Sequence, residues 1–360
     1  MAWRSTPRAG GWLAGSVVGY SMWKVDRQTG AAKVIIPAPE GQADDIAVGP
    51  NGDLAWTNYL MGTLRYRAND SAPLQVLAKD LPGLNPVDFD RKNGEAYNPA
   101  TGELKLLTSG KLAVPAGLKL DRDSLWVADV FGFRQVNAKS GDVKDVFRMQ
   151  ASDMEYAFAV GVSTKQFALA SWFTGTVQIV DRATLKTVHI HALKAPFDAL
   201  PMEDGSVLYA EMATGSITRA SGADYKTTKV VAEGLADPVQ MTLGRDGALY
   251  VTEAAGKLTR IDLATGAKTE IANGLAMPEG VAQTPWGSFI VAETATARLT
   301  EIDPSNGTRR TVAANLPIGM PAGPGMPPPC VVTAVAVAAD GTVYVSADKN
   351  NAVYSIRPQR

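Results

Sequence analysis

Asp237-Pro-Val-Gln-Met-Thr-Leu-Gly-Arg-Asp-Gly-Ala-Leu-Tyr-Val-Thr-Glu253 is followed by a second stretch of the same pattern, Pro278-Glu-Gly-Val-Ala-Gln-Thr-Pro-Trp-Gly-Ser-Phe-Ile-Val-Ala-Glu293. Gly247 and Gly287 hold equivalent places and set a repeat of about 40 residues. Each copy has an apolar run, a polar turn with glycine, and a second apolar run that ends in a carboxylate. This pattern predicts antiparallel strands. A repeat of this length made only of strands predicts a β-propeller.

The composition excludes several classes of protein. The 360 residues are 46% hydrophobic and carry a formal net charge of -1, with no basic stripe of the kind that binds nucleic acid. No run of roughly 18 apolar residues is present, so we expect no membrane span. A single cysteine excludes an internal disulfide. We expect a monomer, with a secreted or periplasmic location favoured over a cytoplasmic one.

The repeat can be counted along the chain. An unpaired second half of the repeat stands near the start, at residues 22–26 and 32–36, after a segment 1–20 that we expect to be irregular. Full units follow at residues 46–58, 86–98, 117–129, 158–171, 197–211, 237–253, 278–293 and 333–348. The unit at 86–98 is compressed, and its outer strands are predicted at 103–108 and 111–114.

The last unit lacks an outer strand, and the amino-terminal half unit carries one. Propellers commonly close by letting both termini donate strands to one blade, which leaves no exposed edge. We therefore predict that residues 1–360 form one all-β domain, a propeller of seven or eight four-stranded blades with eight preferred, closed by strands from the two termini.

Two segments interrupt the regular spacing. The first is a loop rich in proline and glycine at residues 316–330, which enters the last inner strand and is therefore expected over the mouth of the central channel. The second is Met149-Gln-Ala-Ser-Asp-Met-Glu-Tyr-Ala157, which reaches the same edge. Either segment can be a lid or a pocket wall, or an irregular surface loop.

Acidic residues gather at one edge of the predicted ring, because the start of an inner strand and the end of the second strand meet there. The candidate catalytic residues at second-strand ends are Glu211, Glu253 and Glu293. The candidate metal ligands at inner-strand starts are Glu279, Asp45, Asp198 and Asn85. Oxygen ligands without a cysteine or histidine cluster favour Ca²⁺ or Mg²⁺. Alternatively, a carboxylate that ends a strand accepts backbone hydrogen bonds as a recurring feature of the blades.

Other residue types add less. Tyr156, Trp172, Phe197 and Cys330 are candidates for the wall of a substrate pocket, although such residues usually pack between blades. His189 and His191 are the only histidines, and they alternate on one face of a predicted outer strand. Because that strand is far from the channel, we expect these two side chains at the surface and not in catalysis.

The repeat resembles the calcium-dependent β-propeller superfamily of gluconolactonases, strictosidine-synthase-like proteins and virginiamycin B lyases. Gly49-Pro-Asn-Gly-Asp-Leu-Ala-Trp-Thr-Asn58 is similar to the repeat of the lyases, whose channel histidine has no counterpart here. Pro278-Glu279-Gly280 resembles the Glu-Gly element of gluconolactonases, in which a glutamate, an asparagine and an aspartate hold the metal. Asn85 and Asp198 are the nearest matches to the other two ligands.

The resemblance and the acidic edge imply a metal-assisted hydrolase of a lactone or ester of a small organic molecule. In that hypothesis the ion polarises the carbonyl and a carboxylate activates water. A non-catalytic scaffold that binds a small molecule or peptide is the alternative from another class. A lyase or cyclase that uses a channel glutamate is a third possibility.

Overall fold

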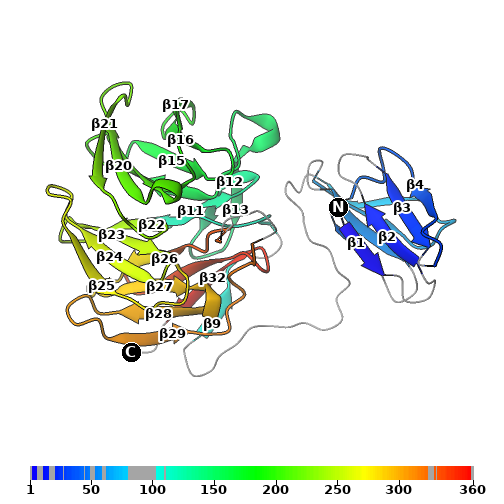
Figure 1. Ribbon diagram of the computed structural model, residues 1–360. Helices are drawn as coiled ribbons and strands as arrows, with labels where there is room; N and C mark the ends of the chain where they lie inside the picture. Colours follow the sequence, from blue (N-terminus) through cyan, green and yellow to red (C-terminus); the bar gives the residue numbers. More distant parts are fainter. Residues whose placement is uncertain are drawn as a thin grey trace. The chain divides into compact units, whose positions relative to one another are not determined.

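A computed structural model describes most of the chain (Figure 1). The described residues are 2–5, 11–15, 21–26, 28–43, 45–48, 53–58, 62–79, 103–108, 111–322, 328–329 and 331–357. They fall in two compact units, Met1–Glu95 and Ala96–Arg360. The described residues contain no helix with the length and hydropathy needed to cross a membrane.

The described strands form eight antiparallel sheets of four strands each, which confirms the prediction of an all-β propeller. The only helices among the described residues are three single turns, η1 (Met149–Ala151), η2 (Met212–Thr214) and η3 (Thr294–Thr296). Within each sheet the strands follow one another in chain order, except in the sheet that takes in β9. The meander deduced from the 40-residue repeat is therefore the repeating unit of the structure.

The unit Met1–Glu95 contains two sheets. The first comprises β1 (Ala2–Ser5), β2 (Gly11–Gly15), β3 (Met22–Asp26) and β4 (Ala32–Ile36). The second comprises β5 (Asp45–Val48), β6 (Leu54–Asn58), β7 (Thr63–Arg67) and β8 (Gln75–Ala78). The expectation of an irregular segment 1–20 is wrong for residues 2–5 and 11–15. Residues 11–15 pair with the strand 22–26, residues 2–5 pair with 11–15, and together they supply the half unit that was missing from the sequence count.

The unit Ala96–Arg360 contains six sheets. The first sheet comprises β10 (Leu118–Asp121), β11 (Ser124–Asp129), β12 (Gly132–Asn137) and β13 (Val143–Arg148). The second comprises β14 (Ala159–Val162), β15 (Gln166–Ser171), β16 (Thr176–Asp181) and β17 (Thr187–Ala192). The third comprises β18 (Pro196–Pro201), β19 (Val207–Glu211), β20 (Ser216–Ser221) and β21 (Thr227–Ala232). The fourth sheet comprises β22 (Pro238–Leu243), β23 (Leu249–Glu253), β24 (Lys257–Ile261) and β25 (Lys268–Ala272). The fifth comprises β26 (Pro278–Gln283), β27 (Phe289–Glu293), β28 (Arg298–Ile302) and β29 (Arg309–Ala313). The last comprises β30 (Val335–Val337), β31 (Val343–Ala347), β32 (Ala352–Arg357) and β9 (Glu103–Leu106).

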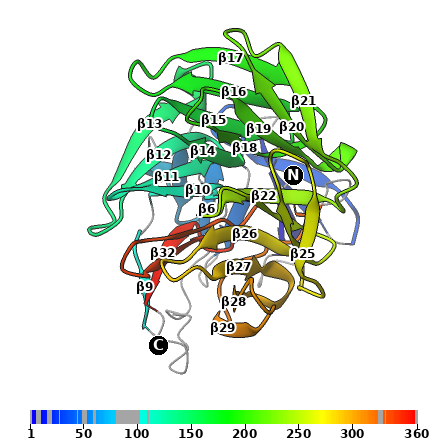
Figure 2. The same ribbon diagram turned by 90° about the vertical axis from the view of Figure 1, so that its left-hand side faces the viewer.

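The inner strands of these six sheets form a closed cycle. In the order β10, β14, β18, β22, β26 and β30, each contacts the next, and β30 contacts β10. Figure 2 shows β10, β14, β18, β22 and β26 around a common centre. The ring is therefore complete within Ala96–Arg360. The number of blades and the single domain predicted from the sequence depend on how the two sheets of Met1–Glu95 relate to this ring. Both therefore stay predictions.

The predicted partner of the last sheet is wrong. The free edge of β32 is covered by β9, with Tyr354 opposite Leu106 and Arg357 opposite Glu103, and not by an amino-terminal strand. The strands β3 and β4 have their own partners in β1 and β2. An earlier strand does complete the last sheet, as the exposed edge requires, but it was expected in the unit at 86–98. Residues 111–114, predicted as a strand, form no strand.

The hydrophobic core lies between neighbouring sheets. One cluster joins Leu208 and Ile217 of the third sheet of the ring to Met241, Leu249 and Ile261 of the fourth, all of them fully buried. Alternate residues of the strands supply these side chains, as a period of two predicts. Because sheets pack face to face around the ring, the starts of the inner strands are held close together, and this edge carries the acidic residues.

Candidate functional site

The three glutamates at second-strand ends make the same contact in consecutive sheets. The backbone N–H of Lys194 donates to Glu211, that of Ala236 to Glu253 and that of Ala276 to Glu293, at 2.9, 2.5 and 2.7 Å. Donor and acceptor are 17 residues apart in each case. Each carboxylate therefore ties the entry of an inner strand to the end of the second strand. This is the structural role that the sequence left open as the alternative for these residues.

Glu293 has further partners on its own sheet. The Arg298 guanidinium donates to both carboxylate oxygens at 2.9 and 3.0 Å, and the Thr300 hydroxyl also donates to this carboxylate. Burial favours a higher pKa, but these bonds and the Ala276 N–H together hold the pKa of Glu293 below its ordinary value. Glu293 is thus a charged, fully paired group, which suits a structural role better than that of a base.

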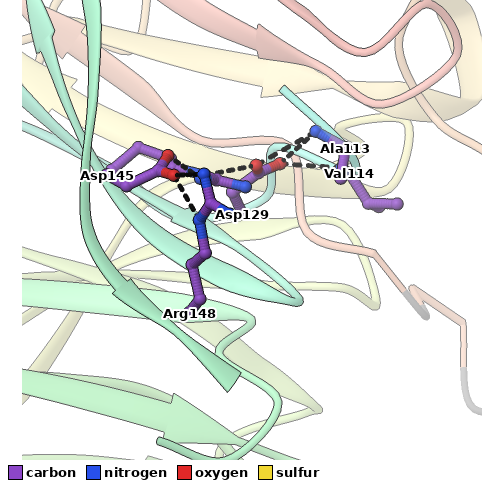
Figure 3. A network of polar contacts seen from close by, with 6 residues as sticks. Ala113, Val114, Asp129, Asp145 and Arg148 are labelled. Atoms are coloured by element: carbon purple, nitrogen blue, oxygen red, sulfur yellow. Dashed lines mark hydrogen bonds and ion pairs between the residues drawn. The ribbon is translucent and has the colours of Figure 1, made fainter. Parts of the chain in front are cut away.

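Asp129 holds the equivalent place in the first sheet of the ring (Figure 3). It accepts the backbone N–H groups of Ala113 and Val114 at 2.8 and 2.7 Å, and it pairs with Arg134 at 3.0 Å. Burial raises the pKa of Asp129 to about 6, although the Arg134 charge opposes the rise. Arg134 also pairs with Asp145. The network fastens the segment before β10 to its own sheet.

Glu279 differs from these residues, because it lies at the start of an inner strand. Its side chain is 1% exposed. The Thr294 hydroxyl donates to Oε1 at 2.7 Å, and the Thr333 N–H, from the entry to the next sheet, donates to Oε2 at 2.6 Å. Burial raises the pKa of Glu279 to about 8 against these two bonds, and the charge of Asp348 adds to the rise. At neutral pH this carboxyl therefore keeps its proton for most of the time.

Asp348 is the second acidic group beside Glu279. It is fully buried, and its Oδ2 accepts the Met320 N–H at 2.6 Å. Its Oδ1 is buried and has no hydrogen-bond partner among the described residues. Burial raises the pKa of Asp348 as well. A buried carboxylate oxygen without a partner is uncommon and calls for a ligand, a proton or a water.

The backbone around Glu279 explains how its carboxyl reaches the next sheet. The pairing of β26 with β27 is irregular between Pro278 and Val281, which re-aims the side chain of Glu279. A Cβ atom at Gly280 would lie 2.7 Å from the Thr333 carbonyl oxygen and 2.8 Å from the Val335 nitrogen. Glycine therefore lets β26 approach β30 closely enough for the Thr333 N–H to meet the carboxylate.

Asp198 and Lys119 both bond to the backbone of one residue of the inner strand β22, Met241. The Met241 N–H donates to Asp198 Oδ2 at 2.8 Å, and Lys119 Nζ donates to the Met241 carbonyl at 3.0 Å. Since β10 and β22 are opposite each other in the cycle of six, the lysine side chain crosses the central channel. Burial raises the pKa of Asp198, with the Lys119 charge opposing the rise. The Lys119 side chain thus spans the channel below the mouth, and we call the space on the mouth side of it the cup.

The expected metal ligands are not brought together by the described residues. No three Asp, Glu, His or Cys side chains in the described ranges are placed to hold a metal ion. Asp198 uses both oxygens for backbone N–H groups, those of Ala199 and Met241. Asp45 belongs to the other unit, and Asn85 lies outside the described residues. Glu279 and Asp348 are close enough for the charge of Asp348 to raise the pKa of Glu279, and we call them the acidic pair.

The described part of the loop 316–330 lies at the mouth, together with the aromatic residues expected in a pocket wall. Met320, Tyr156 and Trp172 pack against one buried cluster, and Val332, just after the loop, shares a second cluster with Phe197. Trp172 and Phe197 stack with ring centroids 6.1 Å apart. Cys330 lies outside the described residues. We call these apolar side chains the apolar cover, which is linked to the acidic pair by the Met320 N–H bond to Asp348.

A cavity of about 820 Å³ opens at the opposite edge of the ring, between the first and last sheets. Leu120, Val337 and Tyr344 contribute apolar surface to it, and Arg122 and Asp340 contribute charge. It is separate from the acidic pair, because the inner strands run from one edge to the other. It has the size of a small-molecule site, but none of the sequence candidates line it.

Sequence reasoning missed Lys119, Thr294 and Thr333. Nothing in the repeat marks Lys119, whose partner is 122 residues away in the chain. Thr294 directly follows the strand-end Glu293, and a hydroxyl at that position was a signal that could have been used. Thr333 acts through its backbone, which no sequence pattern distinguishes.

Comparison with known proteins supports the fold. No protein-family model matches the chain, and no curated protein sequence matches it. A gluconolactonase from Xanthomonas campestris aligns with 72% of this chain and 90% of its own at 14% identity, with a TM-score of 0.53. The WD40 propeller domain of Doa1 aligns with 88% of this chain and 93% of its own at 12% identity and a TM-score of 0.50. A streptogramin B lyase aligns with 99% of this chain and 93% of its own at 14% identity, with a TM-score of 0.36. At such identities the matches to the gluconolactonase and to the WD40 propeller domain support the fold alone.

Proposed function

We propose that this propeller is a hydrolase of small lactones or esters that acts at the mouth of its channel. The observation that carries the proposal is the buried pair of Glu279 and Asp348, in which one carboxyl has its pKa raised to about 8 and the other has an oxygen without a partner among the described residues. Strongly shifted carboxyls in a concave site are candidates for acid and base roles. The gluconolactonase from Xanthomonas campestris shares this fold, and we propose a related activity for this chain.

The pair separates into an acid and a base. Two neighbouring carboxyls do not both ionise readily, so one holds a proton while the other is charged. Glu279 is the acid, because its pKa lies above neutrality. Asp348 is the base, and its free Oδ1 accepts a proton from water. The water oxygen attacks the carbonyl carbon, the carbon–oxygen single bond breaks, and Glu279 gives its proton to the departing oxygen.

A divalent cation fits the described residues only in part. Two carboxylates face the cup, whereas Ca²⁺ takes six to eight oxygen ligands, roughly, from protein and water. Glu211, Glu253 and Glu293 are occupied with backbone donors and offer no further ligand at this place. The proposed reaction therefore uses no metal ion. The Ca²⁺ or Mg²⁺ predicted from the sequence is tested by adding each ion to the assay.

The apolar cover sets the class of substrate. Met320 both packs in this cover and donates its N–H to Asp348, so the backbone at Met320 must shift for a substrate to reach the pair. Tyr156 and Trp172 then offer a flat apolar wall. Small, weakly polar lactones or esters suit such a wall better than highly charged compounds.

The test is a hydrolysis screen of lactones and esters with added Ca²⁺, with added Mg²⁺ and with a chelator. We expect turnover that is lost in Glu279→Gln and in Asp348→Asn. The exposed Asp204→Asn serves as a matched control, because Asp204 pairs with Arg219 away from the mouth. Turnover that persists in both variants at the wild-type level contradicts the proposal, as does a wild-type protein without activity on either class.

A non-catalytic binding scaffold is the second candidate. The observation in its favour is that Glu211, Glu253, Glu293, Glu279 and Asp348 each accept a backbone N–H. In such a protein the acidic groups serve the blades, and the cup holds a ligand unchanged. Binding of a compound from the screen, seen by calorimetry without any product, supports this candidate over the hydrolase.

A further inference from the structure

The two histidines of the chain lie side by side on the outer strand β17. His189 pairs with Ile179 and His191 with Val177 of the neighbouring strand, so both point to the same face. Their ring centroids are 4.3 Å apart at an interplanar angle of 62°. Val188 and Ile190 point to the opposite face and are 55% and 46% exposed. The alternation seen in the sequence has therefore placed both imidazoles together.

Two tyrosines from the next sheet enclose this pair. The Tyr225 ring is 5.2 Å from His189 and 5.7 Å from His191, and the Tyr209 ring is 4.9 Å from His191, between centroids. Two buried polar atoms in this group have no partner among the described residues, His191 Nε2 and the Tyr209 hydroxyl oxygen. Tyr209 is 1% exposed. Orphaned polar atoms so close together indicate a missing ligand.

We propose that His189 and His191 chelate one transition-metal ion, Cu²⁺ or Zn²⁺, between the second and third sheets of the ring. Neutral imidazole is the side chain that these ions favour. The coordination positions that the two imidazoles leave open go to water or to the Tyr209 hydroxyl. This site is separate from the acidic pair at the mouth and does not depend on the proposed hydrolase.

The geometry around the two imidazoles favours a metal. The unpartnered His191 Nε2 and Tyr209 hydroxyl oxygen belong to rings whose centroids are 4.9 Å apart. Because Tyr209 is 1% exposed, solvent does not satisfy its hydroxyl.

Copper titration of the untagged, metal-free protein tests the site, with Cu²⁺ as the probe because it binds such ligands most tightly of the divalent series. We expect one Cu²⁺ per chain, with nitrogen coupling from imidazole in its electron paramagnetic resonance spectrum. His189→Ala and His191→Ala should each weaken binding by at least about tenfold, which is roughly 1.4 kcal/mol. Since the chain has only two histidines, any imidazole signal must come from this pair.

The exposed neighbours supply the matched control. Val188→Ala and Ile190→Ala change the same strand on its other face, so they should leave the copper affinity unchanged. Circular dichroism of all four variants checks that the sheets persist. Copper binding that is equally tight in the double variant His189→Ala/His191→Ala overturns the proposal. Failure of the wild-type protein to bind Cu²⁺ at micromolar concentration overturns it as well.

Discussion

The Thr252 hydroxyl donates a hydrogen bond to the main-chain carbonyl of Glu279, which belongs to the next sheet of the ring. The Thr252 hydroxyl oxygen also accepts the N–H of Gln240, from the inner strand of its own sheet, at 3.1 Å. Ser346 repeats the arrangement in the last sheet, accepting the Ala334 N–H at 2.8 Å and donating to the Ala116 carbonyl at 2.7 Å. A buried hydroxyl in the second strand thus links each of these sheets to the one that follows, and Ser346 links the last sheet to the first.

Removal of these hydroxyls should weaken the ring. In Thr252→Val and Ser346→Ala the inner-strand N–H and the carbonyl of the next sheet lose a buried partner, which costs about 1–3 kcal/mol of unfolding free energy. Urea unfolding measures the loss. Thr269→Val, on an exposed outer strand, is the matched control and should change stability little. Equal midpoints for Ser346→Ala and the control would show that the last sheet is held to the first by packing alone.

Glu279→Gln should make the protein less sensitive to alkaline pH. In the folded state the pKa of Glu279 is about 8, above its ordinary value of 4.5, so stability from this group is lost as pH rises through that range. Glutamine keeps the shape of the protonated acid, because its N–H₂ can donate to Thr294 Oγ1 while its oxygen accepts the Thr333 N–H. The variant should therefore gain stability over the wild type as pH rises, with no further gain above about pH 8.

Thermal midpoints between pH 5 and pH 9 check this. Glu293→Gln is the contrasting variant, because bonds from Arg298, Thr300 and Ala276 hold the pKa of Glu293 below its ordinary value. That carboxylate contributes stability above its unfolded pKa, so its loss should destabilise the protein at neutral and alkaline pH. The same pH trend in both variants would mean that the buried charge of Glu279 is not what limits stability.

The sequence predicted the strands well wherever the repeat is regular. From Leu118 onward the inner and second strands lie where the 40-residue pattern put them. The pattern shows that a segment forms a strand, but not which free edge it covers, and so the pairing of β32 with Glu103–Leu106 was not foreseen. Those two strands are far apart in the chain. Only the closed cycle of inner strands brings them together.

The sequence predicted the edge of the sheets at which the acidic residues lie, but not the contacts that they make. The repeat put Glu211, Glu253 and Glu293 at one edge, and the structure shows their carboxylates bonded to the backbone 17 residues earlier. An equivalent residue in three consecutive sheets is evidence for a contact that these sheets share. Glu279 departs from the repeat, and its buried carboxyl is the one with the raised pKa. A residue that breaks the repeat is thus the stronger functional signal.

Loss of the Arg134 side chain should destabilise the first sheet of the ring strongly. Arg134 is 2% exposed and pairs with the fully buried Asp129 (Figure 3), so Arg134→Ala leaves an uncompensated charge and costs about 3–5 kcal/mol. Without the arginine the pKa of Asp129 should rise above its value of about 6. The loss should then be larger at pH 8 than at pH 5. The double variant Asp129→Asn/Arg134→Met should recover part of the stability. Denaturant unfolding of the wild type, Asp129→Asn, Arg134→Met and the double variant measures the coupling.

Lys119→Met should remove the side-chain bridge that crosses the central channel. The Met241 carbonyl loses its donor, and Asp198 loses the positive charge that opposes the rise of its pKa. We expect a loss of about 1–3 kcal/mol that grows as pH rises, because a buried Asp198 without its cation resists ionisation more strongly. Lys229→Met, on the exposed outer strand β21, removes the same ammonium group and is the control. If both variants have the same stability at every pH, the lysine that crosses the ring is not bonded in solution, and the channel is open below the mouth.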